Sequence, residues 1–335
     1  MKQLKNVDRQ IRNSMRTILH LRTDLPCEYF YIPQKEGGLG LMSFAEHIPR
    51  MKTKLHLKML KSADLQMNAA ANCSLLKGEF TWAKHFSGLT GVQSNKDIFR
   101  AAKQVAENRH TTLGDKFLGR HHAPLAQSHP SAHEWLLWPI LTGGEFITGV
   151  KLYSSSLPTR QNTSIGKIDA NRTCRRCFTS LETETHILQT CPSMKNAICK
   201  RHNTVMYRLG RELQAKLAEV RFEPWVNVNG ENLRPDIVAK CDDTIFVIDV
   251  AISYETSMEK LKSTRAAKEK KYECLKSYYL NEVASVFVIG FVVGSRGVWP
   301  KWNDSILQQL GLSVTFLTTC LSGHDSSLAQ LLKWW

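Results

Sequence analysis

Residues 233–251 read LRPDIVAKCDDTIFVIDVA, and this stretch decides the fold class of the second half of the chain. It holds two runs of apolar and β-branched residues, 233–240 and 244–251, as is typical of strands. The pair Asp242-Asp243 between the runs fits a tight turn. We therefore predict an antiparallel hairpin of two short strands.

Each run carries one acid in an apolar context. Asp236 opens the first strand, Asp249 lies in the second, and twelve residues separate them. Two carboxylates at the ends of paired strands can converge on a hard divalent ion such as Mg²⁺, which activates water against a phosphodiester. Because an unpaired buried carboxylate is costly, we expect a metal or another cation near Asp249. The alternative is an aspartate satisfied by a neighbouring arginine or a backbone amide.

The chain around the hairpin alternates between helical and strand patterns. Before it, leucine, valine and methionine at helical spacing predict a helix over 203–220. After it we expect a charged helix over 255–280, a buried strand over 283–293, a helix near 304–310, a strand over 313–319 and a closing helix that ends in Trp334 and Trp335. This order predicts a mixed α/β domain.

The charged helix carries a third group of interest. Lys268 and Lys271 are three residues apart and Lys268 and Tyr272 are four apart, so the three side chains share one helix face. A lysine at this place could neutralise the pentacovalent phosphate of a hydrolysis reaction or orient the attacking water. The alternative, a solvated lysine run on an exposed helix, applies best to Lys270 and Lys276.

A second motif precedes this domain, where residues 174–191 read CRRCFTSLETETHILQTC. Three thiols and an imidazole at C-x2-C-x8-H-x4-C spacing can close a tetrahedral zinc site. Four protein ligands leave no position for water, so the zinc would be structural and would fold its loop. The predicted ligands are Cys174, Cys177, His186 and Cys191.

Two alternatives to this zinc site remain open. The cysteines could be buried thiols whose spacing is coincidental, or His202 could replace Cys191 as the fourth ligand. The remaining cysteines are scattered along the chain, which is typical of reduced thiols rather than of a disulfide framework.

The composition favours a polyanionic partner. Lysine and arginine outnumber aspartate and glutamate by 45 to 30, which gives a formal net charge of +15 and points most simply to nucleic acid. No apolar run is long enough to span a bilayer, and the first eight residues lack a secretory apolar segment. We therefore expect a soluble, intracellular protein without a membrane partner.

The first half of the chain is predicted to be helical. Residues 1–65 form helices broken by a loop over 26–40, and segment 42–60 has basic residues among apolar ones. This basic helix is either a phosphate-contacting surface or a solvated helix face. Residues 65–135 are polar and poor in motifs, and residues 135–158 are aromatic and apolar. We predict that residues 66–165 together form a helical linker.

The two acids and the lysine resemble the motif of the restriction-endonuclease-like superfamily, which is PD followed by D/E-x-K. In this chain the lysine expected two residues after Asp249 is replaced by Ala251. Lys268, on the following helix, would then take the place of the motif's lysine.

The order of the motifs resembles the C-terminal region of the polyproteins of R-two-type site-specific non-LTR retrotransposons. In these polyproteins a reverse transcriptase is followed by a thumb and linker, a CCHC knuckle and this type of endonuclease. The features that carry the resemblance are the CCHC motif upstream of the Arg-Pro-Asp triplet, the spacing of the aspartates, the helix-borne lysine, and segments 30–33, 37–41, 48–50 and 157–159.

The resemblance implies a role for each candidate residue. Asp236 and Asp249 would bind a catalytic Mg²⁺, and Lys268 with Lys271 and Tyr272 would be the helix-borne catalytic group, while the knuckle would hold a structural Zn²⁺. The implied domains are a thumb-like helical segment (1–65), a helical linker (66–165), the CCHC zinc knuckle (166–202) and a restriction-endonuclease-like α/β domain (203–335).

The resemblance also implies a function. The chain would nick one strand of target DNA in the nucleus, after synthesis in the cytoplasm, and the new 3′-hydroxyl would prime reverse transcription of the element RNA. The polymerase core is expected to be absent, because Asp242-Asp243 lacks the aromatic residue of a polymerase hairpin. The alternatives are a catalytically dead remnant that still binds nucleic acid and an unrelated host zinc-binding adaptor.

Overall fold

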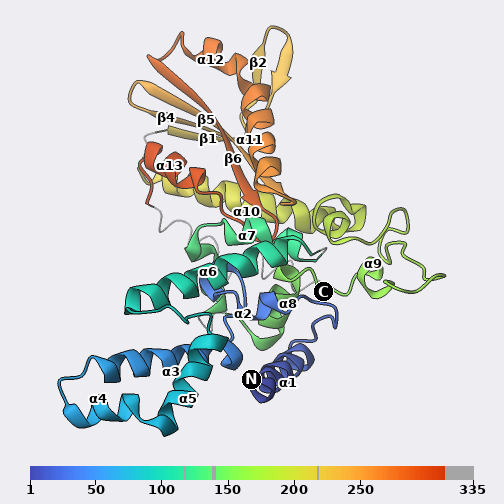
Figure 1. Ribbon diagram of the computed structural model, residues 1–335. Coiled ribbons are helices and arrows are strands. Elements are labelled where there is room, and N and C mark those ends of the chain that lie inside the picture. Colours follow the sequence, from blue (N-terminus) through green and yellow to red (C-terminus); the bar gives the residue numbers. More distant parts are fainter. Residues whose placement is uncertain (117, 138–140, 217–218, 314–335) are drawn as a thin grey trace. The chain divides into compact units, whose positions relative to one another are not determined.

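The computed structural model is a mixed structure of helices and small sheets in two compact units (Figure 1). This confirms the mixed α/β class at the coarse level. The structure describes residues 1–116, 118–137, 141–216 and 219–313. The first unit comprises residues 1–33 and 38–119, and the second comprises residues 34–37 and the chain from residue 120 onward. None of the described helices has the length and apolar character that a bilayer crossing requires.

The regular elements among the described residues of the first unit are all helices, and the predicted basic helix is confirmed as α3. Its helices are α1 (Lys2–Ile18), α2 (Glu28–Tyr31), α3 (Phe44–Leu60), α4 (Leu65–Asn72), α5 (Ser74–Phe86) and α6 (Asn95–Gly114). The buried Asp8 carboxylate of α1 accepts hydrogen bonds from the Ser43 hydroxyl and from the amides of Phe44 and Ala45. These amides belong to the first turn of α3, so Asp8 holds α1 against a helix N-terminus that favours negative charge.

The second unit is built on a four-stranded sheet in the order β1-β4-β5-β6. Strand β4 (Ile237–Cys241) pairs antiparallel with β5 (Thr244–Ser253), which confirms the predicted hairpin, and Asp242 at its turn has φ 49°. Strand β6 (Ser285–Gly294) runs parallel to β5, so the chain must cross over the sheet between them. The crossover consists of α11 (Met258–Tyr272) and α12 (Cys274–Tyr279).

Helices cover both faces of this sheet. On one face, even-numbered residues of β5 pack against α10 (Lys195–Gln214) and α13 (Trp302–Gln309), with Ile248 and Leu209 fully buried. On the other face, odd-numbered residues such as Val247 pack against Tyr272 and Leu275 of the crossover helices. The alternation follows from the two-residue period of a strand, and it places Asp249 on the face covered by α11.

The remaining described helices are short, between three and eleven residues long. They are η1 (Gln34–Glu36), η2 (Gly119–His122), α7 (Ala123–Ala126), η3 (Pro130–Leu136), α8 (Gly143–Tyr153), α9 (Arg160–Thr163), η4 (His186–Thr190) and η5 (Pro192–Met194).

Four predictions of secondary structure need correction or lie outside the described residues. The helix predicted over 203–220 ends at Gln214, and residues 219 and 220 belong to a strand. The run 233–240 is not one strand, because the chain leaves a separate small hairpin at Leu233, and Pro235 has no amide hydrogen to donate to a ladder. The helix predicted over 255–280 is interrupted at Glu273. The strand predicted over 313–319 and the closing helix fall on residues 314–335, which lie outside the described residues.

Three strands were not predicted from the sequence. Strand β1 (Glu219–Phe222) forms the sheet edge beside β4, and β2 (Val226–Val228) pairs with β3 (Glu231–Leu233) in a two-stranded ribbon. The missed signal for the ribbon is the dipeptide Asn229-Gly230. Both residues have positive φ (51° and 83°), which is the requirement of a two-residue hairpin turn.

Replacing Gly290 by alanine should destabilise the sheet. Gly290 lies in β6, and a β-carbon there would lie 2.7 Å from the backbone oxygen of Arg265 in α11. The helix must move away from the sheet, so Gly290→Ala should lower the free energy of unfolding by about 1–3 kcal/mol, as measured by urea denaturation. Gly144→Ala is the matched control, because its β-carbon meets nothing within 4 Å. Equal stability of the two variants would contradict the close approach of α11.

Candidate functional site

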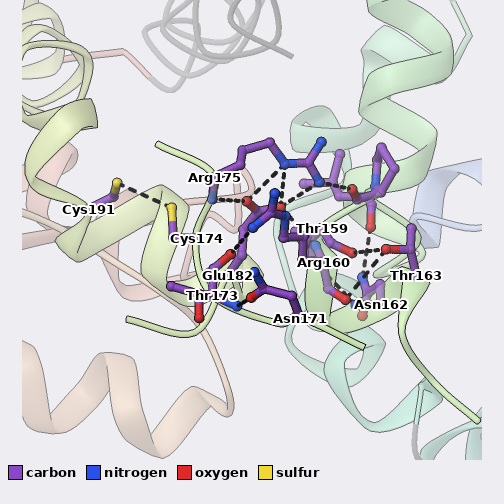
Figure 2. Close-up of polar contacts among 12 residues, drawn as sticks. Thr159, Arg160, Asn162, Thr163, Asn171, Thr173, Cys174, Arg175, Glu182 and Cys191 are labelled. Atoms are coloured by element: carbon purple, nitrogen blue, oxygen red, sulfur yellow. Dashed lines mark hydrogen bonds and ion pairs between the residues drawn. The ribbon is translucent and has the colours of Figure 1, made fainter. Parts of the chain in front are cut away.

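The four residues of the CCHC motif come together in one cluster. Their ligand atoms all lie within 4.8 Å of one another, as expected from the spacing. Cys174 and Cys177 lie on a loop closed by the bridge between Thr173 and Leu181, and η4 carries His186. The five-residue π-helical turn from His186 to Thr190 places Cys191 beside Cys174, and Figure 2 shows these two sulfurs facing each other.

The distances in the cluster suit a tetrahedral zinc ion. The two sulfurs of Cys174 and Cys191 are 3.9 Å apart, and the Cys177 sulfur lies 3.3 Å from His186 Nε2. Tetrahedral zinc with its usual bond lengths separates two sulfurs by about 3.8 Å and a sulfur from a nitrogen by about 3.6 Å. The donor set of three thiols and one imidazole therefore fits Zn²⁺ in both chemistry and size.

Neighbouring groups orient the zinc ligands. The Thr190 hydroxyl lies 3.3 Å from His186 Nδ1, which leaves Nε2 directed at the cluster. The Thr179 hydroxyl donates to the Cys177 sulfur at 3.2 Å and lowers the pKa of that thiol to about 6. Burial raises the pKa of Cys191 to about 11, so this thiol needs the metal to become a thiolate.

A fully buried carboxylate holds the loop of the cluster. Glu182 accepts hydrogen bonds from the amide and guanidinium of Arg175 and from the amide of Arg160 (Figure 2). Burial opposes ionisation of this group, but the bonds from Arg175 prevail and lower the pKa of Glu182. The ionised Glu182, paired with Arg175, therefore holds the loop of the cluster in place.

The predicted acids and lysine also converge. Asp236 directly precedes β4 and its Oδ2 accepts the Val250 amide of β5 at 2.6 Å, so its carboxylate extends the ladder beside Asp249. Lys268 of α11 places its Nζ 2.6 Å from Asp249 Oδ2. Residues from a turn, a strand and a helix thus form one small charged site.

Burial and neighbouring charges have opposing effects on the pKa of Asp249. Burial raises the pKa of Asp249, and the nearby charge of Asp236 raises it further, while Lys268 opposes both effects. Lys268 Nζ lies beside the buried Asp249 Oδ2, and Lys268 and Lys271 both lower the pKa of Asp249. Two adjacent carboxylates, one of them buried, fit a hard divalent cation such as Mg²⁺.

Lys271 and Tyr272 also lie close to the acids. Burial raises the pKa of Tyr272 and the nearby Asp249 carboxylate raises it further, while Lys271 lowers the pKa of Asp249. The buried Tyr272 hydroxyl donates to the backbone oxygen of Arg234 at 2.9 Å and thereby fixes the turn that leads to Asp236. Lys271 is exposed, and its Nζ lies 2.9 Å from the Tyr272 hydroxyl. Of the helix residues predicted for the site, Lys268 alone has a described ion pair with one of the two acids.

Two neighbours of the acids were not assigned to this site from the sequence. His202 of α10, considered as an alternative zinc ligand, instead places Nε2 3.3 Å from Asp236 Oδ1. Gly290 of β6 is the register partner of Asp249. Both residues are far from the acids in sequence, and they meet the acids only because different elements pack together. No local sequence pattern could therefore have predicted these contacts.

The chain is similar to curated retrotransposon polyproteins over most of its length. No family model matches the chain. The chain is 28% identical over 337 residues to a Retrovirus-related Pol polyprotein from type-1 retrotransposable element R2 of Popillia japonica, covering 96% of this chain and 67% of the relative. It is 30% identical over 255 residues to the polyprotein from type-2 retrotransposable element R2DM of Drosophila melanogaster, covering 74% of this chain and 23% of the relative.

The chain is homologous to a region of the R2-type non-LTR retrotransposon polyprotein. A second R2 polyprotein from Popillia japonica is 25% identical over 97% of this chain, which spans 45% of that relative. The chain therefore covers between 23% and 67% of these relatives' lengths.

Cys191→Ser should remove zinc from the R2-type chain. We expect the purified wild-type protein to hold zinc in an equimolar amount, and the variant to lose it because three ligands bind far more weakly than four. Atomic emission spectrometry of the dialysed proteins measures the metal. Cys199→Ser is the control, since Cys199 is an exposed thiol outside the cluster. Zinc loss in His202→Ala with retention in Cys191→Ser would contradict this ligand set.

Proposed function

We propose that this R2-type chain is a metal-dependent DNA endonuclease module. It nicks one strand of target DNA, and the resulting 3′-hydroxyl primes reverse transcription of the element RNA. The observation that carries the proposal is the meeting of Asp236, Asp249 and Lys268 on one side of the sheet. Cleavage of genomic DNA implies that the module acts in the nucleus.

The chemistry divides between the acids and the lysine. Asp236 and Asp249 would hold Mg²⁺, which when bound supplies a water activated for attack on the phosphodiester. The Val250 amide keeps the Asp236 carboxylate in place through its Oδ2. Lys268 is half-buried beside Asp249, so its ammonium can neutralise charge that develops on the scissile phosphate.

The zinc cluster would have a structural role and would take no part in cleavage. Its four protein donors leave no open coordination site for substrate. Tyr254, just after the end of β5, donates its hydroxyl to Glu184 Oε2 at 3.2 Å, and Glu184 lies in the zinc loop. A folded knuckle is thereby joined to the strand that carries Asp249.

The helical unit contributes a surface suited to nucleic acid. On α1 the basic residues recur every three or four positions and so form one stripe, and the acid of this helix, Asp8, is buried against α3. The Arg12 and Arg16 side chains lie over the rings of Tyr31 and Phe30. A rigid row of cations fits the phosphates of target DNA or element RNA. The stripe consists of Lys2, Lys5, Arg9, Arg12 and Arg16.

One observation favours the alternative of a binding remnant without catalysis. Ala251 stands where the superfamily motif has its lysine, and it is buried on the same face of β5 as Asp249. Lys268 reaches Asp249 from the helix instead, so the charge is replaced from a different element. Whether this replacement supports cleavage separates the two hypotheses.

Asp249→Asn should abolish magnesium-dependent nicking of a supercoiled plasmid, because the amide keeps the shape but loses the charge that binds the metal. Lys268→Ala should slow nicking by roughly 100-fold. Lys270→Ala is the control, since this lysine is exposed on the same helix. Gel assays should compare buffers with and without Mg²⁺, and should avoid chelators that would strip the zinc.

The nicking assay also identifies the remnant. A folded, zinc-loaded wild-type protein that shifts DNA but does not nick it would overturn the endonuclease. Nicking by Asp249→Asn at the wild-type rate would place the chemistry elsewhere.

Removing two cations from the α1 stripe should weaken the salt dependence of DNA binding. Each phosphate contact contributes about 0.9 to the slope of log affinity against log salt, so Lys5→Ala with Arg9→Ala should reduce the slope by about 2. Fluorescence polarisation with a labelled duplex at several salt concentrations measures it. The control pair is Arg100→Ala with Lys103→Ala, whose charges already face Asp97 and Glu107. Equal slopes for both pairs would contradict a specific role of α1.

A further inference from the structure

We propose that the β2–β3 ribbon contacts the DNA duplex beside the cut and selects where the nick is made. The inference rests on the proposed endonuclease function and adds to it the part of the chain that reads the substrate. The observations behind it are the two-faced build of the ribbon, the chemistry of its outer face and its attachment to Asp236.

The ribbon has one buried face and one exposed face. Val226 pairs with Leu233, and both are buried with the cluster that contains Tyr272 and Tyr279. The ribbon lies against α12, so its inner face is fixed to the crossover helices (Figure 1). The alternating residues point the opposite way and are exposed.

The exposed face carries an aromatic ring, a guanidinium and two amides. Trp225 is 72% exposed, although burying a ring of this size is strongly favourable. The Arg234 guanidinium lies 5.3 Å from the centre of that ring. One step along the ribbon, Asn227 Nδ2 donates to Asn232 Oδ1 at 2.7 Å, and both residues are exposed.

This set of groups suits the reading of bases more than the neutralisation of phosphate. Glu223 lies 3.1 Å from Arg234, and Glu231 is exposed near the turn, so the ribbon adds little net positive charge. Asparagine amides form paired hydrogen bonds with adenine in the major groove, which admits a two-stranded ribbon. The ring of Trp225 supplies a flat apolar surface for a thymine methyl or a sugar.

The ribbon is joined directly to the candidate catalytic acids. Arg234 is two residues before Asp236, a chain distance of at most about 7 Å. The backbone oxygen of Arg234 accepts the hydroxyl of the buried Tyr272, which makes the junction rigid. A DNA duplex bound by the ribbon would therefore be held at a fixed position relative to Asp236 and Asp249.

Duplex DNA fits this surface better than duplex RNA does. The major groove of A-form RNA is deep and narrow, so that side chains cannot reach its base edges. An A-form arm in the experiment therefore separates the two nucleic acids.

The test is selection of bound sequences from a random duplex pool, in Ca²⁺ without Mg²⁺, followed by mapping of nick positions in Mg²⁺ on a long duplex. The variants are Trp225→Ala and the pair Asn227→Ala with Asn232→Ala. The control is Asn281→Ala, an exposed asparagine on the turn after α12. Zinc content and thermal melting of each variant establish that it folds.

We expect the wild-type chain to enrich particular sequences and both ribbon variants to lose about tenfold of that preference. Their nicks should spread over more positions, while the slope of binding against salt stays unchanged. The control should keep the wild-type preference, and an RNA duplex of the enriched sequence should compete poorly.

The outcomes separate the ribbon from the nuclease. Loss of sequence preference in ribbon variants of a chain that never nicks supports the contact between ribbon and duplex, but overturns the proposed function and with it the choice of nick position. Wild-type preference and nick positions in both ribbon variants overturn the ribbon while the nuclease stands. No enrichment by the wild-type chain, or equal competition by the RNA duplex, also overturns the proposal.

Discussion

A negative charge in the middle of a buried strand constrains the second unit. Asp249 is 4% exposed, with apolar residues before and after it in β5. Such a group is tolerated only with a positive partner, and Lys268 supplies one from the crossover helix. The parallel pairing of β5 with β6 requires that crossover, and Gly290 lets α11 approach the sheet. The strand order, the position of α11 and the charge of the site therefore depend on one another.

A second set of buried charges joins the zinc loop to the ends of β5 and β6. Arg296 and Glu255 are fully buried and 3.1 Å apart, and Arg201 of α10 donates to the Leu188 oxygen at 2.7 Å. Burial raises the pKa of Glu184 to about 7, even with the Tyr254 hydroxyl bonded to it. Charges of this kind stabilise a unit only when their partners hold position, so they favour one arrangement of loop and sheet over looser ones.

The two proposed nucleic-acid surfaces differ in physical character. The α1 stripe is a row of cations whose attraction acts on any phosphate backbone and weakens with salt. The β2–β3 ribbon presents amides and one aromatic ring, and these groups act at contact distance. Affinity and choice of site would therefore be carried by different elements, each described within its own unit.

The sequence by itself determined the features that depend on local patterns. The spacing of Cys174, Cys177, His186 and Cys191 predicted their cluster, and β-branched runs around a turn predicted the β4–β5 hairpin. It also pointed to the residue types of the second site, although their roles stay proposals. These patterns are readable because ligand spacing and strand periodicity are set over a few residues.

The tertiary structure alone decided which distant groups meet. It placed His202 beside Asp236, and it added the Arg234 oxygen as a partner of the Tyr272 hydroxyl, which also lies close to Asp249. It also split the first predicted strand and formed the ribbon from Val226 to Leu233. The physical reason is that these contacts depend on register and on the packing of helices against a sheet, and both are set by interactions between segments that no local pattern records.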